Sequence, residues 1–176
     1  MTKLKAFNFQ NWINDHRHLL KPPVGNKVVF QDSTLIVMVV GGPNQRTDFH
    51  INGTDEFFYQ LEGQAFLRII NEEGKVDQVD LNEGDIFMLP AGVPHSPQRM
   101  EGSVGLVVEH TRTPDSKDAL LWYCASCENK LYQEWFHLDN IETNFGAVYD
   151  RYFNSEHTTC KECGHINGKE WNPPNA

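Results

Sequence analysis

The sequence predicts a mainly β protein: a jelly-roll barrel of two packed antiparallel sheets, with a short helix before it and a small cysteine-rich appendage after it. Two observations predict this fold class. Residues 26–110 contain many short segments rich in β-branched and aromatic residues, and glycine-containing turns separate them. All four cysteines of the 176-residue chain follow this region, in two Cys-x-x-Cys pairs.

The N-terminal helix is predicted at residues 9–20. Trp12, Ile13 and Leu20 recur there at helical spacing and share one apolar face. Asn8 is a suitable N-cap, and the prolines at 22–23 are expected to stop the helix.

The barrel strands follow from runs of apolar residues that end at turn signals. Residues 34–40 form an apolar run of the length of a buried strand, and Asp48-Phe49-His50 alternates as a strand does. Phe57, Phe58 and Tyr59 are consecutive, so on a strand they must face both sides of the sheet. The predicted strands are 27–31, 34–40, 56–71 (a strand and a hairpin), 75–81, 85–89 and 104–109.

A polar stretch at residues 113–119 interrupts this pattern, and we expect a linker there. Residues 1–112 then form the barrel with its helix. Residues 113–176 form the linker and the cysteine region, packed on the barrel, with a strand near 131–138 and a helix near 141–155.

Composition narrows the class of protein. The net charge of −9 argues against a nucleic-acid partner. No apolar run approaches the roughly 18 residues of a membrane span, and residues 1–8 contain no apolar signal core. We therefore expect a cytoplasmic protein. In a reducing compartment the paired cysteines favour a closed tetrahedral site for iron or zinc over disulfides or a redox pair.

A second group of residues has the opposite chemistry. Gly84 is followed by five residues, Pro90-x-Gly92, two residues and His95, which matches the second motif of the cupin fold. The first cupin motif is matched in part, because Asp48 stands where His-x-His is usual before His50. With Glu56, this leaves a three-ligand site with open positions, suited to non-haem iron, although ligand type by itself also admits manganese, zinc or nickel.

The chain offers further charged residues near this site, and Asp48 is expected beside the site or at the surface. Arg46 lies four residues before His50 and Arg99 four after His95, so on strands each shares its histidine's face. They would hold a substrate carboxylate inside the barrel, or pair with acidic residues at its rim. Spacing does not decide between these readings. For Glu109, at a strand end, spacing favours the surface.

Seven runs together carry a resemblance that covers nearly the whole chain: 20–26 (LKPPVGN), 40–44 (VGGPN), 46–50 (RTDFH), 56–60 (EFFYQ), 83–85 (EGD), 95–99 (HSPQR) and 122–127 (WYCASC). They resemble the 3-hydroxyanthranilate 3,4-dioxygenase family, in its form with a cysteine tail. The resemblance implies a homodimeric ferrous cupin enzyme. Such an enzyme opens the ring of 3-hydroxyanthranilate with O₂ to give 2-amino-3-carboxymuconate semialdehyde, a precursor of quinolinate and NAD.

The resemblance also implies residue roles. His50, Glu56 and His95 would hold Fe(II), and Glu56 would also contact the substrate. Arg99 and Glu109 would meet the substrate carboxylate, with Glu109 as an acid–base group, and Arg46 would lie near O₂. The pocket would be shaped by Asn26, Val24, Phe58 and Pro97. A rubredoxin-like Fe or Zn site would be formed by Cys124, Cys127, Cys160 and Cys163.

Two other classes remain as alternatives. Another metal cupin, such as a sugar-phosphate isomerase or an oxalate enzyme, would usually keep His-x-His, but this chain has Asp48 in place of the first histidine. A regulatory protein with a zinc ribbon on nucleic acid would need a Lys/Arg cluster beside the cysteines, which the sequence lacks. The remaining histidines in the second half of the chain are expected at the surface or in packing: His110, His137, His157 and His165.

Overall fold

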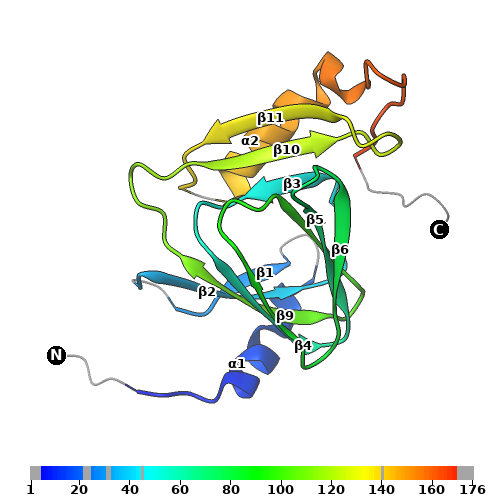
Figure 1. The fold of residues 1–176 in the computed structure, drawn as a ribbon. Helices are drawn as coiled ribbons and strands as arrows, with labels where there is room; N and C mark the ends of the chain where they lie inside the picture. The colour runs from blue at the N-terminus through cyan, green and yellow to red at the C-terminus, as the bar shows by residue number, and fades with distance from the viewer. Residues whose placement is uncertain (1–4, 22–24, 31–32, 45, 140, 170–176) are drawn as a thin grey trace.

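The computed structural model describes residues 5–21, 25–30, 33–44, 46–139 and 141–169. Two antiparallel sheets face each other (Figure 1). The first sheet consists, in spatial order, of β1 (Asn26–Val28), β2 (Leu35–Gly41), β9 (Val104–His110), β4 (Glu56–Glu62) and β7 (Ile86–Leu89). The second consists of β11 (Lys130–Phe136), β10 (Asp118–Tyr123), β3 (Asp48–Ile51), β8 (His95–Arg99), β5 (Ala65–Ile70) and β6 (Val76–Leu81). The predicted jelly-roll class is confirmed.

The barrel core lies between the sheets. Strand alternation sends Phe58 inward with Leu67, Leu89 and Val107, all of them buried. Tyr59, the next residue after Phe58, is 36% exposed. The prediction that consecutive aromatic residues face both sides of a sheet is confirmed, and core packing accounts for the inward Phe58.

Helix α1 (Phe9–His16) covers the outer face of the first sheet, and a 3-10 helix (Arg17–Leu19) continues it. The Asn8 side chain accepts a hydrogen bond from the Asn11 N–H at 2.8 Å, which confirms the predicted cap. Ile13 is buried against Val39 and Val104. The α-helical part ends before residue 20, and the prolines expected to stop it lie outside the described residues.

A strand stands where part of the linker was predicted, and this prediction was wrong. β10 begins at Asp118 and pairs with β3 on one side and β11 on the other. Leu120 and Leu121 are both buried, because helix packing covers one face of the strand and the sheet's own core the other. A strand buried on both faces shows no polar alternation. Residues on both sides of the predicted boundary at 112 share this sheet, and the division into domains stays a prediction.

The C-terminal part packs through helix α2 (Ile141–Phe153), close to the predicted 141–155 (Figure 1). Val148 and Tyr152 are fully buried, and the Tyr152 ring stacks on Trp122 of β10 with ring centroids 4.2 Å apart. A second 3-10 helix (Glu156–Thr158) follows. Within the described ranges, no helix combines the length and apolarity that a membrane crossing requires.

Candidate metal and substrate site

Three predicted ligands meet inside the barrel. His50 of β3 lies directly opposite His95, the first residue of β8, and Glu56 begins β4 on the other sheet. Glu56 Oε1 lies 3.4 Å from His95 Nε2 and 4.0 Å from His50 Nδ1. One donor atom from each residue lies within 4.8 Å of the other two. The two sheets thus bring donors from three separate strands to one point.

This donor set fits a divalent metal ion. With metal–ligand bonds of about 2.1 Å, neighbouring ligands of an octahedral ion are about 3 Å apart. The two Glu56–histidine distances exceed this value by about 1 Å or less. Burial holds the pKa of His95 below its ordinary value, against the opposing charge of Glu56, so its imidazole is neutral at pH 7. Burial raises the pKa of Glu56, but the histidines beside it and a hydrogen bond from Asn52 outweigh burial and lower it. Two imidazoles and one carboxylate suit non-haem iron, with positions left open.

Hydrogen bonds fix the tautomer of both histidines. His50 Nε2 lies 2.7 Å from Asp118 Oδ2, and His95 Nδ1 lies 3.1 Å from the Val93 carbonyl oxygen. Each of these nitrogens donates its proton, which leaves the lone pair of the other nitrogen facing Glu56. Asp118 was missed by the sequence analysis because it lies in the predicted linker. Nothing in its local sequence marks it.

Glu109 lies inside, not at the surface as its spacing suggested, and that reading is corrected. Its side chain is 4% exposed, and Oε2 accepts a 2.6 Å hydrogen bond from Asn52 and pairs with Arg112 Nη1 at 2.9 Å. Burial and the nearby charge of Glu56 raise the pKa of Glu109 to about 7, with Arg112 opposing them. The group can therefore exchange a proton near neutral pH. Asn52 and Arg112 were not predicted as site residues.

Arg99 is a buried cation that faces the site. It is 5% exposed, and burial, followed by repulsion from Arg46, lowers its pKa to about 10. Arg46 differs, because it forms an ion pair with buried Asp48, which also accepts a 3.1 Å hydrogen bond from the Tyr149 hydroxyl. Among the described residues, no ion pair of this kind holds Arg99. An anionic group on a ligand would supply the missing partner.

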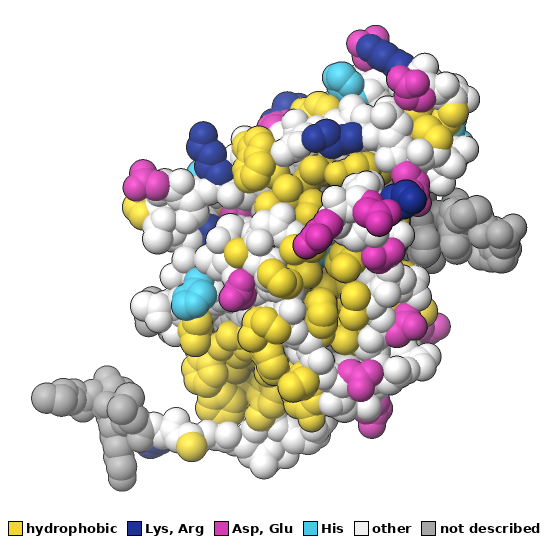
Figure 2. Space-filling view, viewed as in Figure 1, with side chains coloured by type: hydrophobic (Ala, Val, Ile, Leu, Met, Phe, Trp, Pro, Cys, Tyr) yellow, Lys and Arg dark blue, Asp and Glu magenta, His cyan; other side chains and the backbone are white. Residues whose placement is uncertain are grey.

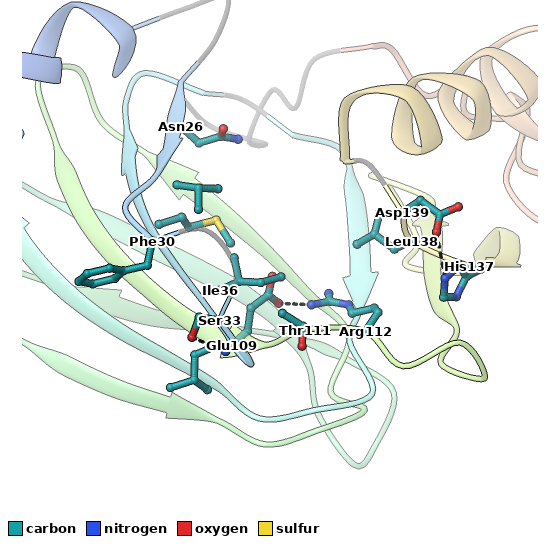
Figure 3. Close-up of a pocket in the computed structure, with 13 residues that line it drawn as sticks. Asn26, Phe30, Ser33, Ile36, Glu109, Thr111, Arg112, His137, Leu138 and Asp139 are labelled. Atoms are coloured by element: carbon teal, nitrogen blue, oxygen red, sulfur yellow. Dashed lines mark hydrogen bonds and ion pairs between the residues drawn. The ribbon is translucent and has the colours of Figure 1, made fainter. Parts of the chain in front are cut away.

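A cavity of about 130 Å³ joins these groups. Asn26, Phe58 and Pro97 are among the residues that line it, whereas Val24 lies outside the described residues. Leu138 and Phe145 of the C-terminal part also line it, and sequence reasoning missed both. A larger hollow of about 600 Å³ adjoins it and shares Glu109 and Arg112, which Figure 3 shows pointing toward one another.

The four cysteines converge at the end of β10, and none of them lines this cavity. The Sγ atoms of Cys124 and Cys163 are 3.5 Å apart, and those of Cys127 and Cys160 are 3.6 Å apart. Sulfur atoms around a tetrahedral metal with bonds of about 2.3 Å would be about 3.8 Å apart, whereas a disulfide needs about 2.05 Å. The spacing therefore fits a closed thiolate site, and none of the four cysteines forms a disulfide.

Both cysteine turns pass through the left-handed region directly after the second cysteine. Glu128 has φ +60° and Gly164 has φ +76°. The N–H of each donates to the carbonyl of the first cysteine of its pair, at 2.9 Å in both turns. Position 128 carries glutamate where the other turn has Gly164, yet the backbone adopts the same turn. His110 and His165 are exposed and His137 and His157 half-buried, as predicted.

A two-sheet barrel that gathers two histidines and a glutamate around one point defines a cupin with a candidate mononuclear metal site. The chain belongs to the 3-hydroxyanthranilic acid dioxygenase family, whose family model matches residues 1–153. The predicted resemblance is thereby confirmed.

Named relatives agree with this assignment. The 3-hydroxyanthranilate 3,4-dioxygenase of Xanthomonas euvesicatoria pv. vesicatoria is 51% identical over 164 residues, which are 93% of this chain and 92% of the relative. That of Shewanella woodyi is 50% identical over 177 residues, covering 99% of this chain and 92% of the relative. A solved cupin-2 domain protein from Shewanella frigidimarina aligns over 60% of this chain and 95% of its own, at 21% identity and a TM-score of 0.48. That likeness is too distant to bear on function.

Proposed function

We propose that this chain catalyses the ring-opening dioxygenation of 3-hydroxyanthranilate by O₂, giving 2-amino-3-carboxymuconate semialdehyde, with Fe(II) held by His50, Glu56 and His95. One observation carries the proposal: a three-ligand N/O cluster and a buried, unpaired Arg99 open into the same cavity. Family membership supports the same substrate. Ferrous iron, when bound, supplies Lewis acidity and the electron exchange with O₂ that an aromatic ring does not undertake directly.

The chain's own residues bind and orient the substrate. Arg99 receives the substrate carboxylate, because a guanidinium offers two parallel N–H donors to a carboxylate. Glu109 lines the same cavity as Arg99 and, with a pKa of about 7, accepts the proton that the substrate hydroxyl loses. Arg46, held by Asp48, places a fixed positive charge where oxygen becomes anionic.

The direct test uses the anaerobic protein loaded with Fe(II). After addition of 3-hydroxyanthranilate and O₂, the amount of semialdehyde formed should equal the amount of oxygen consumed. An oxygen electrode measures the oxygen, and absorbance measures the semialdehyde. Protein that binds one Fe(II) in the N/O site yet consumes no oxygen with this substrate would refute the proposal.

Gly105 of β9 supports the position of Arg99. A Cβ built on Gly105 would lie 2.7 Å from Arg99 Nη1 and 3.2 Å from Gln60 Oε1. We predict that Gly105→Ala displaces the guanidinium and raises KM roughly tenfold, because misplacement by about 1 Å is costly at a binding group. Steady-state kinetics check this. Gly146→Ala is the matched control, since nothing lies within 4 Å of a Cβ there. An unchanged KM would show that the Arg99 guanidinium, in its present position, does not bind the substrate.

We also propose that Cys124, Cys127, Cys160 and Cys163 hold a structural iron or zinc ion. The near-tetrahedral sulfur spacing supports this. Four thiolates leave no open position, so the ion would stabilise the fold rather than take part in the reaction. Its role would be to anchor α2, whose Tyr152 packs on Trp122 two residues before Cys124.

Replacing Cys124, which is 2% exposed, by serine is predicted to release this ion and lower Tm by roughly 5–10 °C. A loss of 2–3 kcal/mol moves Tm by about 2–4 °C per kcal/mol in a chain of this length. Calorimetry and metal analysis measure both effects. Ser126→Ala, an exposed position in the same turn, is the control. Wild-type Tm in the cysteine variant would make the ion dispensable.

Finally, we propose a cytoplasmic homodimer that binds neither membrane nor nucleic acid. Four free cysteines persist in a reducing compartment. Figure 2 shows hydrophobic side chains gathered where β2 and β9 lie. A hollow of about 350 Å³ on this side is lined by Phe7, Phe9, Val29, Phe30, Val37 and Leu106. Such a face suits burial against a second copy. A monomer at micromolar concentration in sedimentation equilibrium would contradict the dimer.

A further inference from the structure

Two of the proposed metal ligands are joined by a continuous chain of buried side chains that passes behind the site. Each neighbouring pair in this chain is in hydrogen-bond contact, and the contacts measure between 2.6 and 3.0 Å. The chain begins at one ligand and ends at another. In order, its members are His50, Asp118, Arg112, Glu109, Asn52 and Glu56.

The first half of this chain controls the His50 imidazole. Asp118 accepts from His50 Nε2 at 2.7 Å, and its side chain is 1% exposed. Arg112 holds that carboxylate with two nitrogens, Nε at 3.0 Å from Oδ1 and Nη2 at 2.6 Å from Oδ2. This paired contact fixes the plane of the Asp118 carboxylate, and with it the direction in which His50 presents Nδ1.

The second half controls the carboxylates. The remaining terminal nitrogen of Arg112, Nη1, binds Glu109 Oε2 at 2.9 Å and the His110 carbonyl oxygen at 3.1 Å. Glu109 also accepts from Asn52 Nδ2, and the same amide nitrogen lies 3.0 Å from Glu56 Oε1. Figure 3 shows Glu109 and Arg112 pointing toward one another at the wall of the larger hollow.

We propose that Arg112 is a positioning residue for the metal site: through Asp118 and Glu109 it holds His50 and Glu56 in ligand geometry before a metal binds. This inference rests on the proposed metal site. Arg112 also lines the cavity, but in this role it acts on the ligands through its two carboxylate partners, Asp118 and Glu109.

Charge explains why an arginine stands here. Asp118, Glu109 and Glu56 are three carboxylates that are each at most 6% exposed. Buried carboxylates repel one another unless a cation or hydrogen bonds compensate them. Arg112 is itself 5% exposed and contacts two of the three. Without it, Asp118 and Glu109 would turn toward other donors, and the two ligands at the ends of the chain would lose their fixed orientation.

The test measures metal affinity, which a merely structural ion pair would not change well below Tm. The probe is Mn²⁺ followed by electron paramagnetic resonance, because imidazole and carboxylate ligands suit Mn²⁺ and thiolates do not. The variants of the full-length chain are Arg112→Met, Asp118→Asn and the double variant. Arg17→Met is the matched control, since it removes the Arg17–Glu62 pair at 2.7 Å and neither of these residues lines the cavity.

Each single substitution is expected to raise the Kd for Mn²⁺ by about tenfold to a hundredfold, the usual effect of removing a partner of a metal-bound histidine. The double variant should raise it by less than the product of the two, because both act on one imidazole. The Arg17→Met control should bind as the wild type does.

Variants that fold and bind Mn²⁺ within about twofold of the wild type would overturn the inference. If Arg112→Met does not fold, the Kd for Mn²⁺ of Arg112→Lys and of Asp118→Asn tests the inference, with the same twofold limit. Lysine keeps the charge but cannot contact both carboxylates in the same way, so affinity must still fall. Mn²⁺ binding by the wild type must depend on His95. If the wild type binds no Mn²⁺, or if His95→Ala binds it equally well, the proposed function is refuted, and the inference with it.

Discussion

Replacing Glu56 by glutamine is expected to remove metal binding and turnover together. Glu56 is the one negatively charged ligand of the cluster, and the residues around it lower its pKa so that it is ionised at neutral pH. Glutamine has nearly the same shape but leaves three neutral donors for a divalent cation. We expect kcat/KM to fall on the order of a thousandfold, which corresponds to about 4 kcal/mol of transition-state stabilisation.

Metal analysis and oxygen uptake measure this result. Glu73→Gln is the control, because Glu73 is an exposed turn residue and the chemical change is the same. In the wild type, a chelator should abolish turnover and added Fe(II) should restore it, whereas Mg²⁺ should not. A Glu56→Gln protein that keeps one iron in this site and wild-type activity would show that Glu56 is not a ligand.

Replacing Arg99 by methionine is expected to lower kcat/KM roughly a hundredfold, chiefly through KM. Arg99 is a buried guanidinium at 5% exposure, and the pKa of about 10 reflects its burial without an anionic partner. Loss of one member of a buried charge pair costs about 2–5 kcal/mol. Because the carboxylate is held in both the ground state and the transition state, most of the loss appears in KM.

The substrate itself provides the sharpest control. 2-Aminophenol has the same adjacent hydroxyl and amine but no carboxylate, so the wild type should use it poorly and Arg99→Met should use it no worse. The Arg17→Met protein should treat both compounds as the wild type does. If Arg99→Met loses the same factor with both compounds, then Arg99 does not bind the carboxylate.

Much of the site could be predicted because its signals are local. The spacing from Gly84 to His95 predicts a turn at a strand end with a histidine after it, and the Cys-x-x-Cys pairs predict thiolate ligands in tight turns. Such patterns depend on neighbours along the chain, so they can be recognised before the fold is known. The candidate ligands could therefore be named from the sequence, whereas their convergence from separate strands and turns is seen only in the structure.

The partners of these ligands could not be predicted in the same way. His50 contacts Asp118 across 68 positions of sequence, and Asn52 contacts Glu109 across 57. β10 was missed because both its faces are buried, one of them by α2, and this removes the alternation that identifies a strand.

The amino-acid sequence by itself determined the barrel class, the ligand types and the opposite chemistries of the two candidate metal sites. The tertiary structure alone decided that Glu109 is buried, that Arg99 lacks a carboxylate partner among the described residues, and that Arg112 links two ligands. The physical reason is that burial and charge pairing depend on every element packed around a group. Strands from two sheets surround these side chains, and no single segment of sequence contains that information.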